Sequence, residues 1–252
     1  MTCIDGKENE LEFVKYLNKK TISQLNPLFR ELIDKLFPNE KENEMIKSWK
    51  NRYKEKSDIF IKISDKTKGL SIKKGCKNSV HVERISDFIH FLIENGLEKA
   101  FVIDYLKYHY ADGSTNGKGK CRISAKDYKK ANQSKIDEIN QAFNDETLLK
   151  KAIERFITKG KNSNHYIAAI IYGEVNDFVW ATPKDIEEMM LSKKDIYSSA
   201  VHFSLMTCQP KNRCLNYNPT YEKDRYCIQI KWYNIFDDII EHMNKKCLQN
   251  KK

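Results

Sequence analysis

The chain has 252 residues, of which 40% are apolar and 11% aromatic, enough to build a substantial hydrophobic core. Its formal net charge of +10 favours a polyanionic partner, because lysine and arginine side chains that neutralise phosphates release counterions, although a chain rich in Lys, Asn and Ile acquires such a charge from codon usage alone. No apolar run is long enough to span a bilayer, Met1 to Gly6 shows no signal-peptide pattern, and the seven cysteines form no CxxC pair, so we expect a cytoplasmic protein with free thiols and no membrane partner.

Apolar residues recur at helical spacing through the first fifty residues. They predict helices over residues 10–18 and 21–37, the second ended by Pro38. A third helix is expected over residues 42–53, with Met45, Ile46 and Trp49 facing inward and Glu44 elsewhere on its surface. The N-terminal segment is therefore predicted to be helical.

Residues 56–83 contain the pattern around which the chain is organised. Two alternating apolar runs, 59–63 and 70–73, flank a polar turn over residues 65–69, which is typical of a β-hairpin with one face in solvent. Since side chains alternate between the faces of a strand, Asp58 is expected on the opposite face from Ile59. Ser71 and Lys73 are expected to point outward together, on the same side of the sheet as Asp58.

The middle of the chain is predicted to be mainly helical. An apolar stripe from Ile85 to Ile93 with Ser86 as N-cap predicts a helix that stops at Gly96, and further helices are expected over residues 98–108, 124–143 and 146–158. His109 is expected at the surface. The Gly/Ser-rich stretch over residues 111–120 indicates a linker or a mobile loop.

The last third of the chain returns to strands, which are expected over residues 166–172, 177–181, 199–207 and 226–232, with a short helix starting at Thr182 and Pro183. A long loop over residues 209–225 holds Lys211, Arg213 and Arg225 among tyrosines. Such a set suits phosphate contact and base stacking or readout, although an ordinary surface loop in a chain rich in Lys and Tyr has the same composition. We favour the functional interpretation because the loop is long and has few acids.

An acid that opens one strand and a lysine on the next strand resemble the core of PD-(D/E)xK nucleases. The matching residues are Asp58 and then Ser71-Ile72-Lys73. Ser57 stands where that family often has proline, and Ser71 stands where it usually has Glu or Asp. The continuation from Lys73 to Lys74 and Gly75 and on through Asn78 to His81, followed by a helix, is similar to restriction endonucleases.

This resemblance implies an α/β, restriction-endonuclease-like fold, with a mixed central sheet flanked by helices in a single domain over residues 1–252 and a helical elaboration over 98–160. It implies a Mg²⁺-dependent endonuclease of restriction-modification type that cuts double-stranded DNA, with a homodimer left open. The implied catalytic residues are Asp58, Ser71 and Lys73. The candidate Mg²⁺ ligands are Asp58 with Glu83 or Glu44, the last two by position alone. The residues expected to contact DNA are Lys74, Asn78, Ser79, His81, Lys211, Arg213 and Arg225.

Three alternatives stay open. The serine at position 71 is compatible with a nuclease-like protein that has lost its metal site and only binds DNA. An RNA-directed nuclease fits the same residues. Gln229-Ile230-Lys231 repeats the spacing of the motif, which makes Lys231 the second choice for a catalytic lysine.

Overall fold

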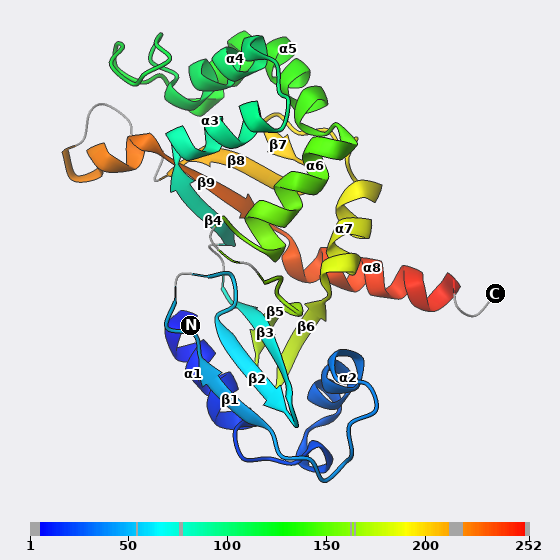
Figure 1. Cartoon of the computed structure of the whole chain (residues 1–252). Coiled ribbons are helices and arrows are strands. Elements are labelled where there is room, and N and C mark those ends of the chain that lie inside the picture. Colours follow the sequence, from blue (N-terminus) through cyan, green and yellow to red (C-terminus); the bar gives the residue numbers. More distant parts are fainter. Residues whose placement is uncertain are drawn as a thin grey trace. The chain divides into compact units, whose positions relative to one another are not determined.

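The computed structural model describes residues 6–53, 55–75, 78–161, 163, 165–211 and 219–249. By its internal contacts the chain divides into two compact units (Figure 1). Unit 1 comprises residues 1–78, 157–189 and 234–252, and unit 2 comprises residues 79–156 and 190–233. The single domain with a helical elaboration over 98–160 stays a prediction.

Unit 1 is built on a mixed five-stranded sheet. Its strands are β1 (Lys47–Lys50), β2 (Ile59–Ile63), β3 (Lys66–Lys73), β5 (Ala169–Glu174) and β6 (Asp177–Ala181), in the order β1-β2-β3-β5-β6. The β3–β5 pair is parallel and the other pairs are antiparallel. The predicted hairpin is thus present, with a tighter turn at Ser64 and Asp65.

Helices α1 (Gly6–Leu17) and α2 (Pro27–Leu36) pack against this sheet. The short 3₁₀ helix η1 (Ile22–Gln24) lies between them. Asn26 caps α2 by accepting a hydrogen bond from the backbone nitrogen of Phe29 at 2.9 Å, and Pro27 occupies the first helical position. The apolar faces of α1 and α2 and the β2 isoleucines form the core of unit 1, with Phe13, Leu32 and Ile61 fully buried.

Two further helices complete unit 1. Helix α7 (Pro183–Ser192) starts after Thr182, as predicted, although its last residues belong to unit 2. Helix α8 (Ile235–Gln249), which is not among the predicted elements, packs against β5 and β6. None of the helices in the described part of the chain has both the length and the hydropathy needed to cross a membrane.

The helix predicted over residues 42–53 is wrong. The backbone at Ile46 exchanges hydrogen bonds with Lys19 and Lys20 at 2.9 and 2.8 Å, and residues 47–50 then pair with β2 as the edge strand β1. Met45 and Trp49, expected to face inward, are 55% and 41% exposed. In so short a run helical and alternating apolar spacing overlap, and the pairing partner decides which structure forms.

Unit 2 contains a second sheet, which is entirely antiparallel. Its strands are β4 (Ser79–Arg84), β9 (Cys227–Trp232), β8 (Met206–Pro210) and β7 (His202–Phe203), in the order β4-β9-β8-β7. The strand expected over 199–207 is divided into β7 and β8, and β4 was not foreseen. Strands of the last third of the chain are therefore shared between two sheets, which local alternation cannot reveal.

The helices of unit 2 follow the predicted order. They are α3 (Ile85–Glu94), α4 (Lys99–Tyr110), α5 (Ala125–Phe143) and α6 (Glu146–Ile153), followed by a π-helical turn η2 (Glu154–Thr158) that leads into unit 1. Ser124 caps α5 by accepting a hydrogen bond from the backbone nitrogen of Asp127. A 3₁₀ helix η4 (Pro219–Tyr226) precedes β9. The described cysteines Cys121, Cys208, Cys227 and Cys247 are free thiols.

An aromatic cluster forms the centre of unit 2. The fully buried ring of Phe88 lies 5.1 to 6.4 Å, between centroids, from the rings of Phe91, Tyr105, Phe143, Phe156 and Phe203. Phe143 and Phe203 stack at 4.4 Å, which joins α5 to β7. The cluster therefore ties three helices, the η2 turn and the second sheet to one another.

We expect Phe88→Ala to lower the free energy of unfolding by roughly 3–5 kcal/mol, because truncation leaves a cavity that five surrounding rings fill poorly. Urea unfolding followed by far-UV circular dichroism measures this loss. Tyr197→Ala, at a side chain that is 75% exposed in the same unit, is the control and should change stability by less than about 0.5 kcal/mol. Equal effects of the two substitutions would contradict the central role of Phe88.

Candidate active site

Asp58 lies immediately before β2, at the point where three segments of unit 1 meet. Its backbone nitrogen donates to the carbonyl of Leu70 at 2.8 Å, and its carbonyl accepts from the backbone nitrogen of Asn51 at 2.9 Å. Asp58 thus extends the β2–β3 ladder by one residue. Given the register that pairs Ile59 with Leu70, Asp58 stands opposite Ser71.

The side chain of Asp58 collects three donors from β3 through a single oxygen. Oδ2 accepts hydrogen bonds from the Ser71 hydroxyl at 3.1 Å, the Ile72 backbone nitrogen at 2.7 Å and the Lys73 ammonium at 3.0 Å. Lys73 Nζ also donates to the Ile72 carbonyl at 3.2 Å. The structure therefore brings together the three residues that the sequence singled out, on one face of the sheet.

The charged pair of this cluster is partly exposed to solvent, whereas its serine is buried. The side chains of Asp58 and Lys73 are each 23% exposed, whereas Ser71 is 2% exposed. The expectation that Ser71 points into solvent is wrong, because β3 lies between β2 and β5 and is covered on both faces over residues 69–72. Gly69 allows a close approach here, since a β-carbon at that position would overlap the Ser57 hydroxyl.

Two residues, Glu44 and Glu83, are the candidates for a further acid. In the described residues of each unit, no contact brings either of them beside Asp58. Glu44 precedes β1 at the end of the strand where Lys47 pairs with Lys62, whereas Asn51 meets Asp58 at the other end. Glu83 belongs to unit 2. There it pairs with the Arg155 guanidinium at 2.7 Å, and its side chain is 6% exposed.

The environment of Glu83 favours the carboxylate form. Burial disfavours the charge, but the neighbouring imidazole of His81, 3.5 Å away, and the Arg155 guanidinium outweigh it and hold the pKa of Glu83 below its usual value. The His81 ring also packs 5.2 Å from that of Phe156. Within unit 2, Glu83 and His81 are therefore parts of a largely buried charged cluster.

The other residues expected to contact DNA occupy varied positions. Lys74, which follows β3, forms an ion pair with Glu174 at the end of β5 at 2.7 Å. The amide oxygen of Asn78, just before β4, accepts from the Tyr172 hydroxyl in β5 at 3.4 Å. Ser79 starts β4, where it pairs with Lys231 of β9 in the second sheet. Arg213 lies outside the described residues.

Arg225 is buried. Its guanidinium lies 3.3 Å from a carboxylate oxygen of Asp112, and the two side chains are 8% and 0% exposed. Asp112 also accepts from the Ser114 backbone nitrogen and hydroxyl and from the Gly119 backbone nitrogen, at 2.7 to 3.2 Å. One carboxylate therefore accepts hydrogen bonds from both ends of the Gly/Ser-rich stretch. Lys211, by contrast, pairs with Asp224 at the surface.

His109, expected at the surface, is 1% exposed. Its Nε2 lies 3.0 Å from the Arg225 carbonyl, and burial lowers its pKa to about 4. The imidazole is therefore neutral at neutral pH. The sequence signal for this burial is weak, because His109 closes a helix whose apolar residues do not form a single stripe.

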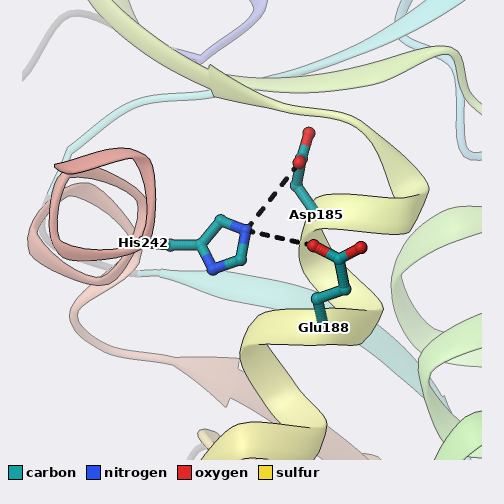
Figure 2. Close-up of side chains that lie close together, drawn as sticks. All are labelled: Asp185, Glu188 and His242. Atoms are coloured by element: carbon teal, nitrogen blue, oxygen red, sulfur yellow. Dashed lines mark ion pairs between the residues drawn. The ribbon is translucent and has the colours of Figure 1, made fainter. Parts of the chain in front are cut away.

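A second cluster in unit 1 joins α7 to α8 (Figure 2). Asp185, Glu188 and His242 present ligand atoms within 4.8 Å of one another. Among the described residues, this is the one group of three Asp, Glu, His or Cys side chains placed closely enough to share a metal ion. Although burial opposes ionisation, the Lys246 ammonium and the Thr182 hydroxyl hold the pKa of Asp185 below its usual value. The sequence pattern of this cluster, D-x-x-E on one helix and a histidine far along the chain, is too common to identify a metal site from sequence.

No family model matches the chain, and no curated protein matches it. A solved structure does: the crystal structure of restriction endonuclease MspI in complex with its cognate DNA matches over 90% of this chain and 88% of that chain, with a TM-score of 0.60 and 11% sequence identity. Likeness at this identity shows the fold alone. The predicted restriction-endonuclease-like α/β fold is therefore confirmed.

Substitution of Arg225 by Met should destabilise the protein by about 3–5 kcal/mol, because the Asp112 carboxylate is then buried without its cationic partner. Lys211→Met breaks an ion pair whose lysine side chain is 36% exposed and should cost less than about 1 kcal/mol. Urea unfolding of the two variants measures both changes. Equal small losses would mean that Arg225 has no structural role and is available for other contacts.

Glu83 should add stability that depends on pH. Because the pKa of folded Glu83 is below its unfolded value of about 4.3, its contribution is complete above that value and is lost as the pH falls through the folded pKa. The difference in unfolding free energy between wild type and Glu83→Gln should therefore shrink between pH 7 and pH 3. Exposed Glu98, substituted by Gln, is the control; a Glu83 difference that stays constant with pH would disprove the linkage.

Proposed function

We propose that this chain is a divalent-metal-dependent endonuclease that hydrolyses phosphodiester bonds in double-stranded DNA, of the type II restriction kind. The observation that carries the proposal is the arrangement of Asp58, Ser71 and Lys73 on adjacent strands, with one carboxylate oxygen engaged by both the strand and the lysine. The shared fold with MspI, whose structure contains cognate DNA, and the net charge of +10 support a nucleic-acid substrate.

The residues around Asp58 suit a metal ligand. Oδ2 is held by three donors, and in the described residues Oδ1 accepts no hydrogen bond, so one oxygen is oriented while the other is left for a cation. Mg²⁺ is bound by one or two carboxylates together with phosphate oxygens and water, which a single aspartate satisfies. When bound, Mg²⁺ would supply positive charge near the scissile phosphate and lower the pKa of a coordinated water.

Each side chain has a distinct role in this proposal. Asp58 holds the cation, and Ser71 fixes the carboxylate without adding charge. Lys73, partly exposed beside them, stabilises the negative charge that develops on the phosphate or orients the attacking water. Glu83 and Glu44 remain proposals for a further ligand. So do Lys74, Asn78, Ser79, His81, Lys211 and Arg213 as DNA contacts, whereas the buried pairing of Arg225 favours a structural role.

A DNA-binding protein without catalysis is the second candidate, and the neutral hydroxyl of Ser71 favours it. With serine in the position of an acid, the 3.0 Å pair of Asp58 and Lys73 is neutral overall and attracts Mg²⁺ less than two carboxylates would. Incubation with plasmid DNA or with RNA, in Mg²⁺ and in EDTA, separates the candidates. Metal-dependent cleavage of DNA supports the endonuclease, retardation without cleavage supports the binder, and cleavage of RNA alone supports an RNA nuclease.

Asp58→Ala and Lys73→Ala should each reduce the rate of plasmid cleavage by about 100-fold or more, because the first removes the metal ligand and the second removes charge stabilisation in the transition state. Gel retardation should show DNA binding within a few-fold of wild type. Asp65→Ala and Lys68→Ala, which change exposed residues in and after the hairpin turn, are the matched controls and should cleave normally.

Full cleavage by both the Asp58 and the Lys73 variants would place the catalytic residues elsewhere. Lys231 would then be the next candidate for the catalytic lysine. A loss of cleavage that the two control variants share would show that the hairpin serves only to support the fold.

A further inference from the structure

The cluster formed by α7 and α8 has the composition of a cation site. Asp185 and Glu188 are three residues apart on α7, and His242 and Lys246 are four residues apart on α8, so each helix presents its pair on one face. Lys246 Nζ lies 2.8 Å from Glu188 Oε2 and also contacts Asp185 Oδ1. These same two oxygens face the imidazole of His242, as Figure 2 shows.

The imidazole contributes an atom without a hydrogen bond. Nε2 of His242 is shielded from solvent, lies 3.7 Å from Asp185 Oδ1 and 3.7 Å from Glu188 Oε2, and makes no hydrogen bond to either. A buried nitrogen left in this state costs free energy unless a proton or a metal ion fills the space between it and the oxygens. The separations are close to the roughly 3.4 Å between ligand atoms of a tetrahedral ion with bonds of about 2.0–2.1 Å.

Asp185 is held in place by a second contact. Its other oxygen, Oδ2, accepts hydrogen bonds from the Thr182 backbone nitrogen at 3.0 Å and from the Thr182 hydroxyl. The helix N-terminus thus fixes the carboxylate and directs Oδ1 toward Glu188 and His242. Ligating carboxylates in metal sites are commonly oriented in this way by an outer hydrogen bond.

The charges of the cluster leave room for a divalent ion. Two carboxylates carry two negative charges. The Lys246 ammonium contacts both of them, and the ammonium of Lys184, whose side chain is 84% exposed and screened by solvent, lies 3.8 Å from Glu188 Oε1. A divalent ion coordinated by Oδ1, Oε2 and Nε2 would neutralise both. Lys246, whose side chain is 36% exposed, has access to solvent when displaced.

We propose that Asp185, Glu188 and His242 form a binding site for one first-row transition-metal ion of the Zn²⁺ type, for which the Lys246 ammonium is the competing cation. One imidazole and two carboxylates suit Zn²⁺ better than Mg²⁺, which avoids nitrogen ligands. The ion would cross-link α7 and α8 within unit 1. This site is distinct from the Asp58 cluster and does not depend on the proposed nuclease activity.

The test is Zn²⁺ binding to the full chain, measured by isothermal titration calorimetry and by the Zn²⁺-dependent change in the unfolding temperature. His242→Ala and Glu188→Gln should each weaken this site by at least about tenfold and reduce the Zn²⁺-induced rise in unfolding temperature. Lys246→Met should tighten Zn²⁺ binding by about tenfold, because the competing cation is removed. Any rise that Mg²⁺ produces at the same concentration, through Asp58, should be unchanged by His242→Ala and Glu188→Gln.

Two substitutions serve as matched controls. Glu187→Gln changes the neighbouring carboxylate on α7, and His90→Ala removes an exposed histidine of unit 2; both should bind Zn²⁺ like wild type. All variants keep the cysteines and Asp58, so Zn²⁺ bound there is common to every protein and cancels. Since Glu188 is 39% exposed on its side chain, Glu188→Gln tests the site even if His242→Ala fails to fold.

The proposal is overturned if wild type, Glu188→Gln and Lys246→Met bind Zn²⁺ with the same stoichiometry and affinity. It is also overturned if Lys246→Met binds Zn²⁺ more weakly than wild type, because the lysine would then support the cluster as an ordinary ion-pair network between the helices.

Discussion

The candidate site depends on the register between β2 and β3. Asp58 receives the Ser71 hydroxyl, the Ile72 nitrogen and the Lys73 ammonium because Ile59 pairs with Leu70, which sets Asp58 opposite Ser71. A slip of one residue would turn Ser71 and Lys73 to the other face and leave the carboxylate without its donors. The register is itself enforced by the alternating burial of the β2 isoleucines, so the hydrophobic core of unit 1 positions the polar cluster.

Two buried ion pairs use charged residues for structure. Glu83 with Arg155 and Asp112 with Arg225 are largely buried pairs in unit 2, and each draws in further polar groups: His81 in the first, and the loop after α4 in the second. Such pairs contribute little net stability compared with apolar packing, but removing one partner is costly. A net positive charge therefore does not identify which basic residues meet a polyanion, and burial removes Arg225 from that set.

The fold is shared with a restriction endonuclease at 11% identity, which is consistent with what the architecture requires. Alternating apolar residues in strands and apolar stripes on helices specify layers and faces, and many sequences satisfy them. Functional side chains occupy few positions and follow different rules. Shared architecture therefore supports the fold directly, while the assignment of Asp58 and Lys73 rests on the contacts that these residues make in this chain.

The sequence by itself determined the elements whose signals are local. The helices from α3 to α6, the hairpin around Ser64 and the shared face of Asp58, Ser71 and Lys73 follow from periodicity, because neighbouring residues carry that information. The predicted cap Ser86 is wrong, since α3 begins at Ile85 with Arg84 as its N-cap. Tertiary structure decided everything that needs a distant partner. Residues 47–50 became a strand by pairing with β2, His109 became buried beneath Arg225, and the late strands were divided between two sheets. The meeting of Asp185 and Glu188 with His242, more than fifty residues later, depends on how α8 packs, and no local pattern encodes that contact.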